Sequence, residues 1–211
     1  MKEYLTVSSA GQAELIINRS RFIGMACPVK SEAEALDMLE SARKKYWDAS
    51  HNCFAYRVGE TANTARFSDD GEPGGTAGKP IMDVLTAKGL TDTLMIVTRY
   101  FGGVLLGAGG LVRAYSRCAA DAVDAAGAVI MRPAAKLTLT LTYPQYNLLE
   151  QYLSSAVDVQ GREYTDTVAV SLMIAESELE GFTSELTRRT DGRVSPVRAG
   201  EGYLRIPAKQ P

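Results

Sequence analysis

Hydrophobic and polar positions along the first 130 residues switch between strand-like and helix-like spacing. The uninterrupted apolar run TLMIVT, at residues 93–98, is typical of a strand buried on both faces of a sheet. Ser31 followed by Glu34 forms a capping box, which predicts the start of a helix. The expected strands are residues 3–7, 14–18, 21–29, 51–58, 66–68, 93–98 and 128–131, and the expected helices are 31–45, 80–88 and 111–126.

The pattern changes after Pro133. The segment KLTLTLTY, at residues 136–143, alternates strictly between apolar and polar positions, as a half-exposed strand does. The strands expected from here on are 136–143, 158–164, 167–175 and 193–198, with helices at 146–155 and 176–189. This βαββαβ order predicts a ferredoxin-like domain. We therefore expect an α+β protein with two domains, at residues 1–133 and 134–211.

Composition excludes several classes of protein. The 211 residues are 45% hydrophobic and 23% charged, which is ordinary for a soluble globular protein. The net charge of −2 means that a nucleic-acid surface would have to be local. Three scattered cysteines and one histidine do not provide a zinc site, so no metal is expected. The N-terminus does not resemble a signal peptide and no apolar run is long enough to span a membrane, so we expect a cytoplasmic protein.

The glycine segment, RYFGGVLLGAGG at residues 99–110, precedes an expected helix. Its spacing fits neither the P-loop nor the dinucleotide-binding fingerprint. A turn at a helix N-terminus offers free N–H groups and the positive end of the helix dipole, which favour an anion. Alternatively, the glycines permit close packing and the arginines pair with Asp121 and its neighbours. The candidate anion- or RNA-binding residues are Arg99, Gly102, Gly103, Gly107, Gly109, Gly110, Arg113 and Arg117.

The carboxylate loop, SDDGEPGGTAGKP at residues 68–80, is rich in acidic residues, glycine and proline. Its carboxylates, with Asp83, could bind Mg²⁺ or transfer protons, but the spacing does not match an EF-hand. Capping of turns, or pairing with Arg66 and Lys79, is the favoured use. The candidate residues of this loop are Asp69, Asp70, Glu72, Thr76 and Lys79.

His51 and Cys53 would suggest nucleophilic catalysis only if they met in space with the right alignment. Cys53 is expected to be a small core residue, so we assign no catalytic residue. The aromatic residues Tyr100, Phe101 and Tyr115 near the arginines could stack on bases or fill the core.

Four stretches of the chain together resemble the Impact family, in its bacterial YigZ-like branch. They are SRFIG, HNCFAY, SDDGEPGGTAGKPI and RYFGGVLLGAGGLVRAY, and the resemblance covers about residues 20–125. It implies that the carboxylate loop is a family signature and that the first domain is similar to the second domain of ribosomal protein S5. A ferredoxin-like domain would follow, as in the translocating elongation factor. Gly74 departs from the serine of many relatives, which weakens the case for a nucleophile there.

The resemblance also implies a link to translation. Eukaryotic Impact proteins restrain a translational-control kinase through an additional N-terminal domain, which this chain is expected to lack. We expect a non-enzymatic binding protein, without a cofactor, that contacts RNA or a ribosome-associated partner through the glycine segment and its arginines. The alternatives are an enzyme acting on a phosphorylated small molecule, since small-molecule kinases share the fold family, and a protein-interaction module without RNA binding.

Overall fold

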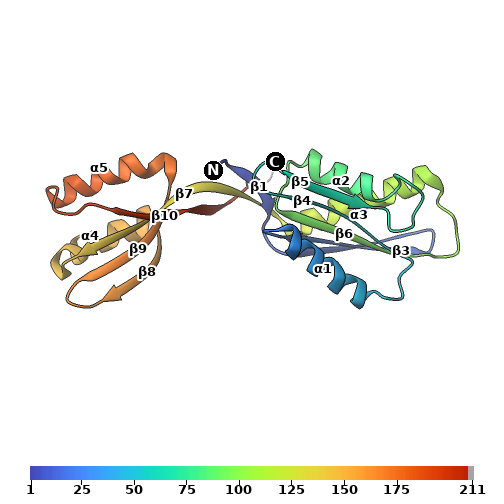
Figure 1. Cartoon of the computed structure of the whole chain (residues 1–211), viewed down its shortest axis with the longest axis horizontal. Helices are drawn as coiled ribbons and strands as arrows, with labels where there is room; N and C mark the ends of the chain where they lie inside the picture. The colour runs from blue at the N-terminus through green and yellow to red at the C-terminus, as the bar shows by residue number, and fades with distance from the viewer. Residues whose placement is uncertain (209–211) are drawn as a thin grey trace. The chain divides into compact units, whose positions relative to one another are not determined.

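The computed structural model describes residues 1–208 and contains two compact units (Figure 1). Residues Glu3–Ile130 form the N-terminal unit, and Met131–Ile206 together with Met1–Lys2 form the C-terminal unit. The division lies close to the boundary expected at Pro133. Independent folding of the two domains stays a prediction.

The N-terminal unit is built on an antiparallel five-stranded sheet with the strand order β2-β3-β6-β4-β5. The five strands of this sheet are β2 (Gly11–Ile17), β3 (Ser20–Pro28), β4 (His51–Val58), β5 (Thr64–Ser68) and β6 (Thr93–Tyr100). The short strand β1 (Tyr4–Val7) precedes them in the chain and is not part of this sheet. Its helices are α1 (Glu32–Lys45), α2 (Gly78–Ala87) and α3 (Gly107–Ala126). The sheet and helices agree with the S5-like arrangement that the family resemblance implies.

Helices cover both faces of this sheet (Figure 1). On the central strand β6, Met95 and Val97 belong to the core formed with α2 and α3. Leu94 and Ile96 belong to the core formed with α1. All four side chains are almost completely buried, so the prediction of a strand buried on both faces is confirmed.

Local signals place several element ends correctly. Ser31 Oγ accepts a hydrogen bond from the Glu34 N–H group at 3.1 Å, as the capping box predicts. The Glu34 carboxylate accepts from the Lys30 N–H group at 2.6 Å, one residue earlier than in the complete motif. Gly89, with a φ of 64°, follows α2 in the left-handed region that glycine enters without strain.

The expected bounds of α3 and of the strand that follows it are wrong. Helix α3 begins at Gly107 and not at Leu111, because its packing against the sheet outweighs the low helix propensity of the glycines in its first turn. The strand β7 (Ala128–Leu141) continues through Pro133, where two strands with a linker were expected. Its pairing with β9 begins only at Ala134, so the missing N–H group of Pro133 removes no hydrogen bond to β9.

The C-terminal unit has the order β7, α4 (Tyr143–Ala156), β8 (Asp158–Tyr164), β9 (Val168–Ala175), α5 (Leu179–Thr190) and β10 (Val197–Pro207). Its sheet runs β10-β7-β9-β8, around a core that both helices share. The last strand was expected at residues 193–198, but β10 begins at Val197 and runs to Pro207. The sequence pattern did not indicate this extent, because Gly200 and Gly202 interrupt the apolar positions of the strand. The predicted fold class, α+β with two domains of which the second has the ferredoxin-like order, is confirmed.

Candidate functional site

The carboxylate loop and the glycine segment meet at one end of the N-terminal sheet. The strand register pairs His51 with Arg99 and Phe54 with Ser68, so the start of β4 and the ends of β5 and β6 lie at the same edge. The β2–β3 hairpin reaches this edge too, because Gly102 N–H donates to Ser20 Oγ at 3.2 Å. We call this region the loop end of the sheet.

Asp69 holds the carboxylate loop closed. Its carboxylate accepts hydrogen bonds from the N–H groups of Gly75, Ala77 and Gly78 at 2.9, 3.0 and 2.8 Å. These donors include the first N–H groups of α2, whose cap residue Ala77 has no side chain that could accept them. Burial opposes the charged form of Asp69, but the three donors outweigh it and lower the pKa of this carboxyl group.

Asp70 ties the same loop to β4 and α1. Its carboxylate accepts from the N–H group of Asn52 at 2.7 Å and pairs with Arg43 at 3.1 Å. Its carbonyl oxygen accepts from Nδ1 of His51 at 2.9 Å. His51 is therefore bound to the loop through one ring nitrogen.

The remaining candidate residues of the loop have near neighbours as partners. Thr76 donates to the Pro73 carbonyl oxygen at 2.7 Å. Lys79 is exposed and pairs with Asp83 one turn later on α2. These contacts bring neither Thr76 nor Lys79 to another candidate residue.

Glu72, a residue of the carboxylate loop, lies in a cluster of largely buried polar side chains. Its Oε1 atom is 2.7 Å from Nη1 of Arg99 and accepts a hydrogen bond from the Tyr115 hydroxyl at 2.7 Å. The side chains of Glu72 and Arg99 are 2% and 6% exposed. Nε2 of His51 lies 3.8 Å from the same carboxylate oxygen, and Cys53 Sγ donates to the Tyr115 oxygen at 3.4 Å.

This cluster separates Arg99 from the other two candidate arginines. Side chains alternate between the two faces of a strand, so Arg99 lies on the same face of β6 as Met95 and Val97. This is the face that α2 and α3 cover. Its guanidinium also donates to Ser20 Oγ at 3.3 Å. Its charge is therefore neutralised inside the unit, where Glu72 is its partner.

The Cys53 thiol and the Tyr115 hydroxyl of this cluster are not activated as nucleophiles. Burial raises the pKa of the Cys53 thiol to about 12. Burial also raises the pKa of the Tyr115 hydroxyl, and the neighbouring Cys53 and Glu72 raise it further. Both groups are protonated at neutral pH, whereas a catalytic thiol needs a lowered pKa.

The glycines of the glycine segment have different structural roles. A Cβ atom on Gly102 would lie 2.1 Å from the carbonyl carbon of Arg19, so this glycine permits close contact with the β2–β3 hairpin. Gly103 and Gly107 have φ angles of 79° and 69°, and a Cβ atom on either would meet no atom within 4 Å. Gly109 lies in the first turn of α3. That first turn, which also contains Gly110, has no acidic residue and no side-chain cap.

Arg113 and Arg117 lie on the exposed side of α3. With the helix starting at Gly107, they occupy its second and third turns, not the first turn that was expected for Arg113. The guanidinium of Arg113 extends back toward the helix start, since its Nη1 lies 3.6 Å from the position of a Cβ atom on Gly109. Arg117 is 3.7 Å from Asp121, whereas no ion pair with any of residues 1–208 involves Arg113.

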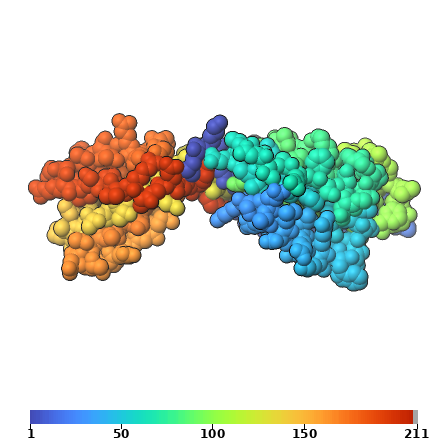
Figure 2. All heavy atoms as spheres, viewed as in Figure 1, coloured from blue at the N-terminus to red at the C-terminus, as the bar shows by residue number. Residues whose placement is uncertain are grey.

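Exposed apolar side chains beside these arginines are the feature that the sequence pattern did not indicate. Leu105 is 86% exposed, and Phe101, Val104 and Val112 are 47%, 41% and 38% exposed. Figure 2 shows the yellow-green atoms of this part of the chain projecting from the N-terminal unit. No local signal marks all four, because Val104 and Leu105 lie between the turn glycines Gly103 and Gly107, Phe101 precedes them and Val112 lies within α3.

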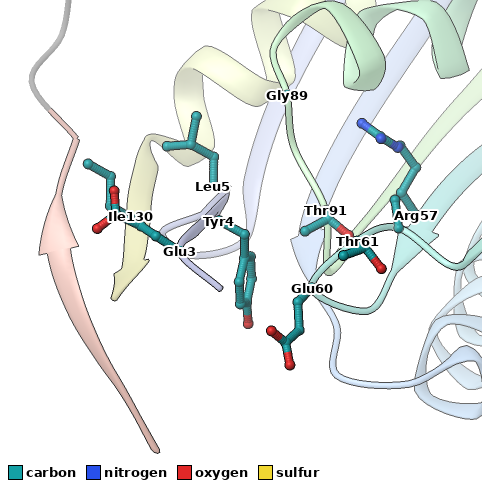
Figure 3. A pocket seen from close by; sticks show the side chains of 10 residues that line it. Glu3, Tyr4, Leu5, Arg57, Glu60, Thr61, Gly89, Thr91 and Ile130 are labelled. Carbon is teal, nitrogen blue, oxygen red and sulfur yellow. The ribbon is translucent and has the colours of Figure 1, made fainter. Parts of the chain in front are cut away.

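A separate depression of about 480 Å³ lies at the opposite end of the sheet (Figure 3). Tyr4, the β4–β5 turn and the turn before β6 line it. None of the candidate residues reaches it. Arg57 in its wall donates to the carbonyl oxygen of Leu90 at 2.9 Å and so secures the chain after α2.

Two further properties concern the described part of the chain. Residues 1–208 contain no group of three His, Cys, Asp or Glu side chains arranged to hold a metal ion. Among the same residues, no helix combines the length and apolar character that crossing a membrane requires.

Comparison with known families gives two matches. The model described as "Impact N-terminal domain" matches residues 18–123, which include the whole loop end of the sheet. The model described as "Domain of unknown function (DUF1949)" matches residues 139–193, within the C-terminal unit.

Relatives with similarity over nearly the whole chain are bacterial. "IMPACT family member YvyE" from Bacillus subtilis is 36% identical over 95% of this chain and 93% of its own length. "IMPACT family member YigZ" from Escherichia coli is 33% identical over 81% of this chain and 85% of its own length. A solved structure described as "Crystal structure of an hypothetical protein" has a TM-score of 0.61 and 29% identity, covering 95% of this chain and 98% of that one.

Proposed function

Because the chain belongs to the Impact family, in its bacterial YigZ-like branch, we propose that it is a non-enzymatic binding protein linked to translation or its regulation. The proposed partners are RNA or a ribosome-associated protein in the cytoplasm. The proposed contact surface is the exposed part of the glycine segment with Arg113 and Arg117. The link to translation depends on the family resemblance.

One contrast carries the proposal. Two carboxylates that could serve catalysis are engaged in contacts within the unit: Asp69 with three N–H groups, and Glu72 with Arg99. The exposed surface beside them carries Arg113 and large apolar side chains instead. Inward-facing acidic and thiol groups with an outward-facing basic and apolar surface favour binding over catalysis.

The start of α3 supports a contact with an anion. Its first turn consists of small residues, lacks a side-chain cap and contains no carboxylate that would repel an anion. Arg113 extends over this turn. A phosphate of RNA or a carboxylate of a protein could accept from the N–H groups and from the guanidinium together.

The test measures binding of the full chain to a mixed-sequence RNA oligonucleotide and to purified ribosomal subunits over a range of salt concentrations. Arg113→Ala with Arg117→Ala should weaken binding, and each lost phosphate contact should reduce the RNA salt slope by about 1. The matched control is Arg188→Ala with Arg189→Ala, which removes two exposed arginines from one helix of the C-terminal unit. Unchanged binding in the Arg113 and Arg117 variant, with a normal circular dichroism spectrum, would exclude the proposed surface.

A further inference from the structure

The exposed part of the glycine segment and the start of α3 form a surface that is apolar as well as basic. Leu105, Phe101, Val104 and Val112 are its large exposed apolar residues. We call these four residues, together with Arg113, the α3 patch. Isolated apolar residues on a surface are common, but four of them between positions 101 and 112 of one chain segment indicate a contact surface.

The helix surface within the α3 patch permits close approach. Positions 109, 112, 113 and 116 lie on one side of α3, away from the buried positions 111, 114, 115 and 118. Gly109 presents only backbone there, between the start of the helix and the side chains of Val112 and Arg113. The guanidinium of Arg113 lies over this position, since its Nη1 atom is 3.6 Å from the position of a Cβ atom on Gly109, so a partner that pairs with Arg113 also comes close to the start of the helix.

The charged residues of this chain segment have one sign. Residues 99–120 include Arg99, Arg113 and Arg117 and no Asp or Glu. Arg99 is neutralised by buried Glu72, and Arg117 lies 3.7 Å from Asp121, so Arg113 is the cation of the patch that has no ion-pair partner within residues 1–208. Electrostatic complementarity then requires an acidic partner.

Hydrogen bonds that hold the patch in place reduce the conformational entropy that binding would cost. Phe101 N–H donates to Ser50 Oγ at 3.1 Å, and the Phe101 ring lies 5.5 Å from the Arg99 guanidinium. Gly102 N–H donates to Ser20 Oγ at the next position. The loop therefore leaves β6 in a fixed direction, which lowers the entropy lost when a partner binds.

We propose that the α3 patch binds a protein segment that carries both apolar and acidic side chains. This inference rests on the proposed function and selects one of its two partner classes. Aliphatic Val104, Leu105 and Val112 gain by covering apolar side chains of a protein, whereas the bases of single-stranded RNA stack on aromatic rings, of which the patch has one. Acidic groups beside the apolar ones would pair with Arg113 and with the N–H groups at the start of α3.

The experiment selects displayed random 16-residue peptides on the full chain and measures the affinity of the enriched peptides. The enriched peptides should combine Asp or Glu with large apolar residues. Leu105→Ser should weaken their binding about tenfold, since one fully covered leucine contributes on that scale. Arg113→Gln should weaken binding and flatten its dependence on salt. The matched control is Leu148→Ser, which changes an exposed leucine on α4 and should leave binding unchanged.

Three other results would contradict the further inference, and one of them would also contradict the proposed function. Enriched peptides without acidic residues, or peptides whose binding survives both Leu105→Ser and Arg113→Gln, overturn the inference. If no peptide is enriched and a mixed-sequence RNA oligonucleotide binds with sensitivity to Arg113→Gln but not to Leu105→Ser, the inference fails while the proposed function stands. If peptides, the RNA oligonucleotide and ribosomal subunits all fail to bind, both proposals fail.

Discussion

Glu72 and Arg99 form an ion pair of 2.7 Å between two side chains that are 2% and 6% exposed. The pair joins the carboxylate loop to the end of β6, and the Tyr115 hydroxyl on α3 donates a hydrogen bond to the same carboxylate. Three segments that are distant in sequence therefore meet at one carboxylate. The unusual composition of the carboxylate loop is explained first by this anchoring, since each of its carboxylates has a partner inside the unit or at its rim.

Removing one member of this pair should destabilise the N-terminal unit strongly. Glu72→Leu leaves the Arg99 charge buried without its carboxylate, and breaking a buried pair in this way costs about 3–5 kcal/mol. The free energy of unfolding, measured by urea titration with circular dichroism, should fall by that amount. The control Arg198→Met breaks an exposed pair with Glu176 and should cost less than about 1 kcal/mol.

The double variant Glu72→Leu with Arg99→Met should be more stable than Glu72→Leu alone. Both charges are then absent, so neither remains buried without a partner. A double variant whose loss of stability equals the sum of the two single losses would show that the two side chains act independently and would contradict the structural role given to the pair.

Asp69 should contribute stability that depends on pH. Its folded pKa is lowered, because three N–H donors outweigh burial, from an ordinary value of about 3.9 in the unfolded chain. Its contribution is therefore fully present above about pH 4 and is lost as the pH falls through the folded pKa. Asp69→Asn should reduce the free energy of unfolding by about 1–3 kcal/mol at pH 7, and this difference should shrink in acid.

The measurement compares urea unfolding of the wild type and of Asp69→Asn at several pH values between 7 and 2. Asp166→Asn, in an exposed turn, serves as the control and should match the wild type throughout. A difference between Asp69→Asn and the wild type that stays constant down to the lowest pH would mean that the ionised carboxylate is not what stabilises the loop.

Local patterns were sufficient for much of the fold. The apolar run at residues 93–98 identified the central strand β6, and Ser31 with Glu34 identified the start of α1. Both signals arise from neighbours in sequence, through burial on two faces and through a cap. The start of α3 could not be read in the same way, because its first turn contains three glycines, whose helix propensity is low.

The candidate site was less accessible to sequence reasoning because its contacts are long-range. Arg99 next to a polar loop suggested an exposed cation, yet the pleat of β6 directs it inward to Glu72, 27 residues earlier. The exposure of Leu105 likewise depends on where the loop leaves the sheet, which no local pattern contains. The sequence left anion binding and close packing open as roles of the glycines, and only the structure separates Gly102, which is in close contact, from Gly103, which is not.

Gly102 should tolerate no side chain, whereas Gly74 should tolerate one. A Cβ atom on Gly102 would lie 2.1 Å from the backbone of Arg19, so the hairpin or the loop must shift. We expect Gly102→Ala to cost about 2 kcal/mol or more in the free energy of unfolding. A Cβ atom on Gly74 meets nothing within 4 Å, so Gly74→Ala should change stability by less than about 0.5 kcal/mol. Equal effects of the two substitutions on urea unfolding would disprove the close contact.

The thiols should be unreactive in the folded chain. Cys27, Cys53 and Cys118 are all buried, and burial raises the pKa of Cys53 and of Cys118 to about 12. At pH 8 only about one Cys53 side chain in ten thousand would be ionised, and the thiolate is the reactive form. Ellman's reagent should therefore label almost no thiol in the native protein and three thiols per chain in urea.

Two variants make the thiol experiment sensitive to a hidden catalytic cysteine. Ser184→Cys introduces an exposed thiol on α5, which should react at once and report one equivalent under native conditions. Tyr115→Phe removes the hydroxyl that accepts from Cys53, and because burial is the main cause of the raised pKa, Cys53 should stay unreactive. Rapid native labelling at Cys53, as identified by mass spectrometry, would instead reveal an activated thiol and favour an enzyme over a binding protein.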